Sequence, residues 1–356
     1  MPCLAGFRLD SAGTEAEVTN HWHLPRDSNI LLTFSIRPDV THSQRLAMNH
    51  KTNRRSFLGS ATVGAAAATL GAASTAAGQQ NQERRVQGDG QEDLSKLGSS
   101  GKTRFAVNVE MWWRREPFLE RLRKAASLGF PAVEFWPYDN KDIDAVAELA
   151  KELNLQIAQF TAWGFSPGLN NPDNHEAFVA RIKEACEVAH KLDCKMMTVV
   201  GGNDQRGMTQ AEMHDNIITG LKLAKPIAED NQVMLILEPM NIRVDHKGHC
   251  LYGSPDPVRI CQEVDSPMVK INWDLYHMQI TEGDLCRRLR EGFEQVGYLQ
   301  LADNPGRHEP GTGEVYYNRV LKEAYELGYR ECVGLECSPA EDEVTAAKRV
   351  AAADVW

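Results

Sequence analysis

The sequence predicts an α/β protein built as a single (β/α)8 barrel, a TIM barrel, with a disordered N-terminal extension. From about residue 103 onward, short apolar runs alternate with helical segments, the pattern of a parallel α/β fold. Eight such units follow one another in about 250 residues, which matches a barrel in both number and size. A doubly wound open sheet fits less well, because no glycine-rich phosphate loop follows the first apolar run.

The eight apolar runs are the expected strands, and a helical segment follows each. The runs fall near 105–110, 132–136, 155–161, 195–200, 233–238, 269–274, 296–301 and 331–336. The helices are expected near 117–128, 140–153, 174–191, 210–229, 255–265, 284–294, 317–327 and 341–352. Two of them should begin at the capping boxes Thr209-Gln-Ala-Glu212 and Ser338-Pro-Ala-Glu341, and a third at Ser254-Pro255.

The chain before the barrel has the composition of an export signal and a linker. Lys51-Thr-Asn-Arg54-Arg55-Ser56-Phe57-Leu58 resembles the twin-arginine motif, and a mildly hydrophobic stretch of small residues follows it to about Ala77. We expect a non-native or disordered extension at 1–47, a twin-arginine signal peptide at 48–78, a disordered linker at 79–102 and the barrel at 103–356.

This organisation predicts a start at Met48 and export to the periplasm or another extracytoplasmic space. The small-residue stretch is too weakly apolar to predict a stable membrane span. The alternative is an accidental Arg-Arg pair before a low-complexity linker, which would leave the protein in the cytoplasm.

Composition narrows the classes of partner. The formal net charge of −10 at pH 7 disfavours nucleic acid or an anionic membrane surface as a partner. The 8 cysteines form no CxxC pair, so no zinc ribbon is expected. We expect a small-molecule substrate. Composition and net charge do not decide whether the protein forms a homo-oligomer.

Oxygen-bearing side chains end each of the last four predicted strands. They are spaced by 36, 26 and 36 residues, about one strand–helix unit each, and are Glu238, Asp274, Gln300 and Glu336. Parallel strands bring their carboxyl ends to the same face of a barrel, where active sites lie, so these side chains should converge. Three carboxylates and an amide oxygen suit a hard divalent cation, Mg²⁺ or Mn²⁺, with Co²⁺ also possible.

Two of these ligands are also suited to proton transfer. Glu238 and Glu336 end the fifth and eighth strands, so they should face each other across the barrel mouth. A cation would polarise a carbonyl oxygen while one carboxylate removes a proton from the adjacent carbon and the other returns one. Asp274 and Gln300 would then mainly hold the metal.

Four phrases around these residues resemble the hydroxypyruvate isomerase family, which belongs to the xylose-isomerase-like barrel superfamily. They are Glu238-Pro-Met-Asn241, Asp274-Leu-Tyr-His-Met-Gln279, Gln300-Leu-Ala-Asp-Asn-Pro305 and Glu309-Pro-Gly-Thr-Gly-Glu314. The resemblance implies interconversion of hydroxypyruvate and 2-hydroxy-3-oxopropanoate (tartronate semialdehyde). It also implies Glu238 and Glu336 as the proton-transferring pair and a divalent metal on the four strand-ending ligands.

Two further residues are candidates for substrate binding. His277 follows Asp274 and would reach substrate oxygens from the loop after the sixth strand, unless it is a structural histidine of that loop. Arg307 follows the seventh strand and would pair with a substrate carboxylate, unless it bonds to a loop carbonyl instead.

Other substrates and functions remain open at this level. The third strand reads Gln159-Phe-Thr-Ala-Trp163, where better-known members of the family carry a His-Asn-Leu-type phrase. An exported ketose 3-epimerase or sugar and polyol isomerase of the same superfamily is therefore one alternative. A non-catalytic sugar-binding barrel is another, although it would not need two opposed glutamates.

Overall fold

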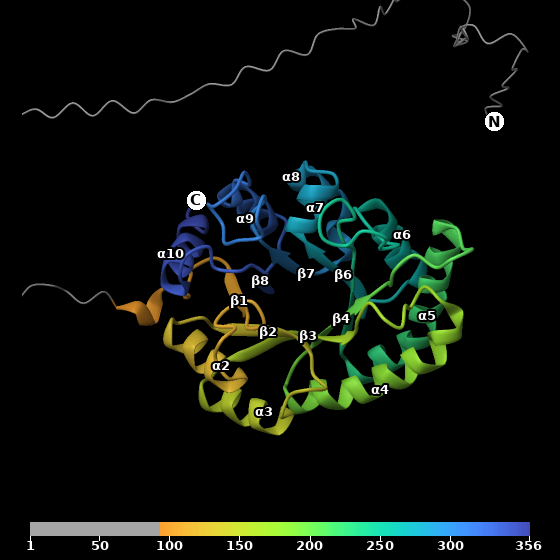
Figure 1. The fold of residues 1–356 in the computed structure, drawn as a ribbon, viewed down its shortest axis with the longest axis horizontal. Helices are drawn as coiled ribbons and strands as arrows, with labels where there is room; N and C mark the ends of the chain where they lie inside the picture. Colours follow the sequence, from red (N-terminus) through yellow and green to blue (C-terminus); the bar gives the residue numbers. More distant parts are fainter. Residues whose placement is uncertain (1–92) are drawn as a thin grey trace, which may run out of the picture. The chain divides into compact units, whose positions relative to one another are not determined.

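The computed structural model describes residues 93–356, which form one closed parallel barrel with its strands in sequence order (Figure 1). The strands are β1 Arg104–Asn108, β2 Ala132–Pro137, β3 Gln156–Trp163, β4 Met196–Val200, β5 Met234–Glu238, β6 Val269–Asp274, β7 Val296–Leu301 and β8 Cys332–Leu335. Each pairs with its neighbours, and β8 closes the barrel on β1. The predicted fold class is confirmed.

Helices surround the ring of strands (Figure 1). They are α2 Phe118–Ser127, α3 Ile143–Glu152, α4 His175–Lys191, α5 Gln210–Asn231, α6 Pro255–Val264, α7 Leu275–Thr281, α8 Leu285–Gly292, α9 Tyr317–Glu326 and α10 Glu343–Ala353, with short 3-10 turns η1 Leu94–Lys96, η2 Pro172–Asn174 and η3 Phe293–Gln295. Their apolar faces pack on the outward-facing strand residues and form the main hydrophobic core. No helix among residues 93–356 is long and apolar enough to cross a membrane.

The predictions for 1–47, for the signal peptide at 48–78 and for most of the linker at 79–102 lie outside the described residues. The end of the linker segment is described, and it is ordered. Residues 94–96 form the 3-10 turn η1, and the backbone N–H of Gly98 donates to the carbonyl of Leu128 at 2.7 Å. The expected disorder therefore does not extend to residues 93–102.

The predicted helix starts are right in two places and wrong in one. The Thr209–Glu212 capping box is present, and Pro255 lies in the first turn of α6. Helix α10, however, begins at Glu343, with Asp342 as its cap. Ser338 is instead held as loop, because its backbone N–H donates to the carbonyl of Arg307 at 3.0 Å.

The short helix α7 directly after β6 was not predicted. Its cap is Asp274, whose Oδ1 accepts from the backbone N–H of Tyr276 at 2.8 Å. Seven residues are too few to show helical periodicity in the sequence. This helix fixes one carboxylate oxygen of Asp274 and leaves the other directed into the barrel mouth.

Side chains fill the inside of the barrel in layers, as expected for eight strands. A small apolar cluster lies toward the amino ends of the strands and consists of Ala106, Ala132, Ala158, Ile236, Tyr298 and Cys332. Two residues further along several strands come buried polar side chains, including Asn108, Glu134, Asn272 and Gln300. The carboxylates of the predicted site form the next layer, at the carboxyl ends.

Candidate active site at the carboxyl ends of the strands

A cavity of about 420 Å³ opens at the carboxyl ends of the strands. One wall carries the charged and titratable side chains, Glu238, His246, His277, Arg307 and Glu336. The rest of the lining is mainly apolar and comes from the ends of β2 to β5 and the loops after them, with Trp136, Pro137, Thr161, Gly164, Phe165, Val200 and Met240. The cavity therefore offers a polar side for reacting groups and an apolar side for the rest of a ligand.

The carboxylates of β5, β6 and β8 converge as the strand spacing predicts. Ligand atoms of Glu238, Asp274, His277 and Glu336 all lie within 4.8 Å of one another, and all four side chains are buried. Burial and the neighbouring carboxylate of Glu336 raise the pKa of Asp274 to about 8. Burial, Glu336 and Asp274 raise the pKa of Glu238 well above its usual value.

This donor set fits a divalent cation. Asp274 Oδ2 is buried and accepts no hydrogen bond from any residue in 93–356, which is costly for a carboxylate oxygen. A cation bound here would compensate that oxygen and the repulsion among the carboxylates. Glu238, Asp274 and Glu336 are the residues placed to hold it, and oxygen donors favour Mg²⁺ or Mn²⁺ over softer metals.

Gln300 lies beside this cluster on β7. Its Cα is the ladder partner of Asp274, so the two side chains point into the barrel from neighbouring strands. The Gln300 amide nitrogen donates to Glu134 at 2.8 Å, and its oxygen accepts from Asn272 at 2.6 Å. A carbonyl oxygen has two lone pairs, so this contact leaves Oε1 one acceptor position for a cation.

His277 presents a hydrogen-bond donor to the carboxylates. Two backbone N–H groups, of Val244 and Asp245, donate to Asn241 Oδ1 and fix the orientation of that amide. Its nitrogen therefore faces His277 Nδ1 at 2.7 Å, so Nδ1 accepts and the ring proton lies on Nε2. His277 Nε2 is 3.5 Å from Asp274 Oδ2. The network thus assigns His277 as a donor rather than a metal ligand.

Glu336 is held by two donors. The indole Nε1–H of Trp136 donates to Glu336 Oε1 at 2.8 Å, and an Arg307 Nη2–H donates to Oε2 at 2.8 Å. Arg307 Nη2 is also 3.8 Å from Asp274 Oδ2. Burial opposes the charge of the guanidinium, but Glu336 and Asp274 outweigh this effect and raise the pKa of Arg307. Arg307 thus lies in the site, as predicted, and not against a loop carbonyl.

The loop after β7 is shaped so that it carries Arg307 into the cavity. Arg307 has a backbone φ of 57°, in the left-handed region that side-chain-bearing residues rarely adopt. The buried carboxylate of Asp303 organises this loop by accepting five backbone N–H bonds, from residues 304, 311, 312, 313 and 315. Glu309 ties the loop to the next one, by accepting from Ala340 N–H at 2.9 Å.

Several residues of the cavity were not predicted as functional. One is Trp136, which contacts Glu336 directly. Phe165 and His246 stack at 4.9 Å between ring centroids and line the cavity. They come from loops after different strands, so no spacing rule connects them. Glu134 and Asn272 did carry a signal, since each is a polar residue inside an apolar strand.

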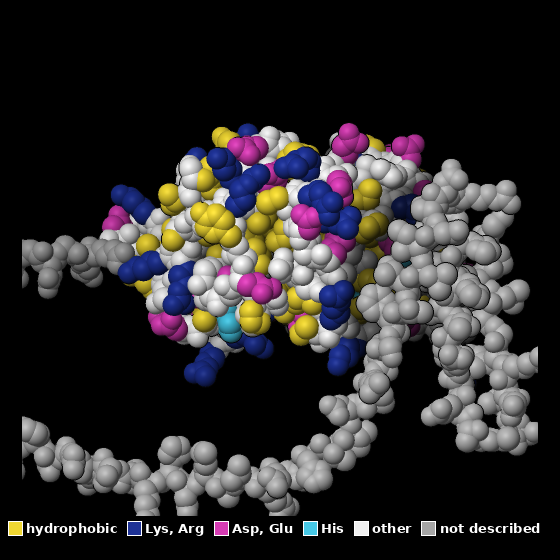
Figure 2. Space-filling model, turned by 90° about the horizontal axis from the view of Figure 1, so that it is seen from above, with side chains coloured by type: hydrophobic (Ala, Val, Ile, Leu, Met, Phe, Trp, Pro, Cys, Tyr) yellow, Lys and Arg dark blue, Asp and Glu magenta, His cyan; other side chains and the backbone are white. Residues whose placement is uncertain are grey.

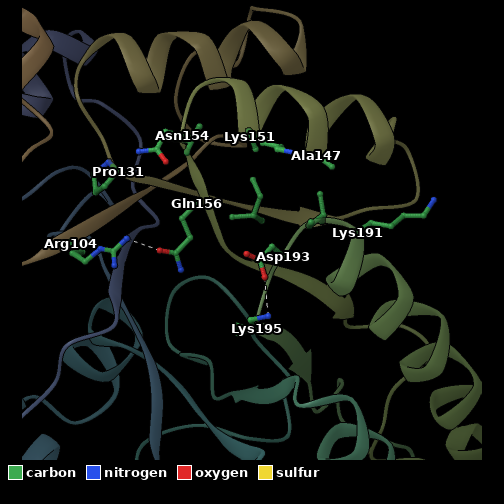
Figure 3. Close-up of a pocket in the computed structure, with 13 residues that line it drawn as sticks. Arg104, Pro131, Ala147, Lys151, Asn154, Gln156, Lys191, Asp193 and Lys195 are labelled. Carbon is green, nitrogen blue, oxygen red and sulfur yellow. Dashed lines mark hydrogen bonds and ion pairs between the residues drawn. The ribbon is translucent and has the colours of Figure 1, made fainter.

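A second cavity, of about 690 Å³, lies at the opposite end of the barrel (Figure 3). Its side chains come from the amino ends of β1 and β3, the turns before the strands, and helices α3 and α4. Arg104 donates to Gln156 at 2.8 Å, and Lys195 pairs with Asp193 at 2.9 Å. Both residues of the second pair are mostly exposed. Residues at the amino-terminal face of a (β/α)8 barrel usually stabilise the fold, whereas the active site lies at the carboxyl-terminal face.

A closed parallel barrel with buried carboxylates at the carboxyl ends of its strands defines a (β/α)8-barrel enzyme. Residues 122–353 match the family model described as xylose isomerase-like TIM barrel, and the chain belongs to this family. The predicted resemblance is confirmed at this level.

Relatives of known name agree with this assignment. The chain is 31% identical to hydroxypyruvate isomerase of Escherichia coli over 243 residues, covering 66% of this chain and 93% of the relative. It is also 31% identical to 2-oxo-tetronate isomerase of Cupriavidus necator over 246 residues, covering 66% and 93%. The protein is therefore an isomerase of the barrel superfamily.

Solved structures show the same fold. A Brucella melitensis protein described as an AP endonuclease of family 2 is 28% identical, with a TM-score of 0.65, covering 68% of this chain and 96% of the other. An L-ribulose 3-epimerase is 18% identical, with a TM-score of 0.61, covering 70% and 92%. At that identity the second likeness concerns the fold alone.

Proposed function

We propose that the protein is a metal-dependent isomerase that interconverts hydroxypyruvate and 2-hydroxy-3-oxopropanoate by proton transfer through an enediolate. The observation that carries the proposal is the pair of buried glutamates, Glu238 and Glu336, whose carboxylates lie within 4.8 Å of each other and of Asp274. The likeness to hydroxypyruvate isomerase of Escherichia coli supports the substrate class.

The surroundings of the two glutamates give them different parts in the reaction. Trp136 and Arg307 donate hydrogen bonds to Glu336 and hold its carboxylate in one orientation beside the cavity, which suits a base. Glu238 has no such donor among the described residues, which leaves its carboxyl group free to hand on a proton and suits an acid. We therefore propose that Glu336 removes the proton from C3 of hydroxypyruvate and that Glu238 delivers one to C2, while the hydroxyl proton on O3 passes to O2.

The metal would sit on Glu238, Asp274, Gln300 and Glu336. A bound divalent cation supplies charge stabilisation for the oxygens on C2 and C3 when they become an enediolate. His277 orients one of these oxygens by donating its Nε2–H, which points toward the same carboxylates. All four ligand side chains are buried, so they lie in a setting of low polarity that strengthens their interaction with a cation.

Arg307 supplies the positive charge for the carboxylate group of the substrate. It lines the cavity and is about one-fifth exposed, so one face of its guanidinium is accessible from the cavity. Arginine recognises carboxylates through paired hydrogen bonds, which lysine cannot reproduce.

The test is a panel assay of the purified protein with Mg²⁺ or Mn²⁺, read by proton exchange with D₂O in NMR spectra. Hydroxypyruvate should exchange the proton on C3, and a chelator should abolish the exchange. Ketohexoses and inositol-type ketones complete the panel. Activity that survives chelation would contradict the metal, and binding of a sugar without exchange of any proton would indicate a non-catalytic barrel.

A second candidate is a ketose 3-epimerase or another sugar isomerase, and the size of the cavity favours it. Hydroxypyruvate has seven non-hydrogen atoms, which at about 30 Å³ per water-sized group fill on the order of half of the 420 Å³. The apolar wall with Trp136 and Phe165 would pack on the C–H face of a longer substrate. In this case Arg307→Lys should leave the turnover of an uncharged ketose within a few-fold of wild type.

We also propose that the protein is made from Met48 and exported through the twin-arginine pathway. The Arg54-Arg55 pair and the small-residue stretch after it support this. N-terminal sequencing of precursor and mature protein tests it, and peptides from residues 2–47 would contradict the start at Met48.

A further inference from the structure

A closed ring of buried polar side chains lies inside the barrel, one layer below the carboxylate cluster. Its five members come from five different strands, and none is more than 2% exposed: Glu134, Gln159, Thr198, Asn272 and Gln300. Buried polar groups need partners, and a fully connected network holds its members in one arrangement. The proposed function gives no part to this ring apart from Gln300.

Hydrogen bonds connect the ring all the way round. Gln300 donates to Glu134 Oε1 at 2.8 Å, and Gln159 donates to Glu134 Oε2 at 3.3 Å. Thr198 donates to Gln159 Oε1 at 2.8 Å. Asn272 closes the ring by donating to Thr198 at 3.4 Å and to Gln300 Oε1 at 2.6 Å.

Glu134 sets the direction of these hydrogen bonds. Three amide groups donate to its carboxylate, the third being Asn108 Nδ2 at 3.0 Å. The Asn108 amide cannot turn without loss, because its oxygen accepts from the backbone N–H of Glu110 at 3.0 Å. An ionised carboxyl group only accepts, and three amide nitrogens surround this one, so the nitrogen of Gln300 faces Glu134 and its oxygen faces away.

The backbone of β8 makes room for this arrangement. Gly334 is the ladder partner of Gln300, and a Cβ at this position would lie 2.3 Å from Glu134 Oε2 and 2.8 Å from Gln300 Cγ. No side chain fits at such distances. Glycine at this position thus permits the direct contact between Glu134 and Gln300.

We propose that Glu134 is a positioning residue that fixes the amide of Gln300 with its oxygen available to the metal. The proposal rests on the metal site of the proposed function, and it assigns Glu134 no contact with substrate or metal. Partners that orient a metal ligand typically contribute about 10–100-fold in metal affinity.

The test is Mn²⁺ affinity measured by calorimetry on the whole protein. Glu134→Gln keeps the shape of the side chain but offers an NH₂ group, which allows the Gln300 amide to turn, so affinity should fall at least about 10-fold. Glu323→Gln is the matched control, a buried glutamate on α9 that pairs with Arg290 and Arg319, and it should keep wild-type affinity. Equal affinities for the two variants would overturn the proposal.

Glu134→Asp separates positioning from charge and serves if Glu134→Gln does not fold. It keeps the negative charge but withdraws the carboxylate by one methylene, beyond hydrogen-bonding distance of Gln300. Positioning predicts a loss of at least about 10-fold here too. Wild-type affinity in Glu134→Asp would show that only the charge of Glu134 matters and would overturn the proposal.

A double-mutant cycle identifies the residue through which Glu134 acts. In a Gln300→Ala background the ligand oxygen is gone, so Glu134→Gln should have little further effect on Mn²⁺ affinity. Additive losses would overturn the proposal, as would a wild type that binds no metal. Non-additive losses together with no exchange of any panel substrate would refute the proposed reaction while leaving the positioning of Gln300 supported.

Discussion

The two ends of the barrel each hold a cavity with charged walls, but the charges are arranged in opposite ways. At the amino ends of the strands the cavity has about 690 Å³, and its ion pair Lys195–Asp193 is largely in solvent. At the carboxyl ends the cavity has about 420 Å³, and the carboxylates of Glu238, Asp274 and Glu336 are almost fully buried. The larger cavity is lined by Arg104, Lys151, Lys191 and Lys195 with a single carboxylate, Asp193, whereas the smaller one brings three buried carboxylates together around one guanidinium.

This difference teaches that the environment of the charges, rather than cavity size, identifies the site. Exposed ion pairs contribute little and shift pKa values little, because water screens them. Buried carboxylates close together are unfavourable, as the raised pKa values of Glu238 and Asp274 indicate. Clusters of buried carboxylates with shifted pKa values are typical of functional sites.

The surface gives no comparable signal. On the side of the molecule seen in Figure 2, acidic and basic side chains are interspersed.

The largest effect should come from the glutamate pair. Glu238→Gln and Glu336→Gln should each lower solvent-proton exchange at the substrate carbon by about 10²–10⁴-fold, because each removes an acid or base. NMR in D₂O measures the exchange. Asp193→Asn, at the amino end, should leave the rate unchanged. If Asp193→Asn slowed exchange as much as either glutamate variant, the assignment of the active site to the carboxyl ends of the strands would be contradicted.

Asp274→Asn should mainly affect the metal. We expect Mn²⁺ affinity to fall at least about 10-fold, since a charged ligand is replaced by a neutral one. The metal-free variant should be no less stable than wild type at pH 8, because Asn keeps an acceptor for the Tyr276 N–H and removes a repelling charge. Calorimetry and thermal unfolding in EDTA check both. A metal-free variant much less stable than wild type would show that the buried charge is structural.

Stabilisation by metal should grow with pH. Burial and Glu336 raise the pKa of Asp274 in the folded protein from its ordinary value of 3.8 to about 8, so the metal-free folded protein binds more protons than the unfolded chain between these values. Its stability should therefore fall as pH rises through this window. Mn²⁺ replaces the proton, so the rise in Tm on adding Mn²⁺ should be a few degrees larger at pH 8 than at pH 6.

Asp274→Asn is the control for this pH dependence. Without the titrating carboxyl, the Mn²⁺-induced rise in Tm should vary less between pH 6 and pH 8. A wild-type rise that is equal at both values would contradict the raised pKa of Asp274 in the folded protein.

The smallest effect should come from Arg104→Ala at the amino end. This change removes the exposed hydrogen bond to Gln156, so the free energy of unfolding should change by at most about 0.5 kcal/mol. KM for the substrate should not change. Denaturant unfolding and steady-state kinetics measure both quantities, and a raised KM would indicate that the amino-end cavity takes part in function.

Much of the fold was predictable because eight strands carry their own local signals. Apolar runs bounded by helix caps, such as Thr209–Glu212, are properties of neighbouring residues and need no tertiary information. The cap at Ser338 failed because contacts with Arg307 and Glu309, from a different loop, hold that segment outside the helix. A local capping pattern therefore predicts a helix start correctly unless residues of a distant loop form hydrogen bonds with the same backbone N–H groups.

The sequence by itself determined the order of the barrel strands and the convergence of Glu238, Asp274 and Glu336. Both follow from spacing, because parallel strands in sequence order bring their carboxyl ends to one face. Only the tertiary structure decided how each side chain is held: the proton on His277 Nε2, the donors on Glu336, and the ring that turns the amide of Gln300. These depend on hydrogen bonds between residues up to 200 positions apart, which no local pattern encodes.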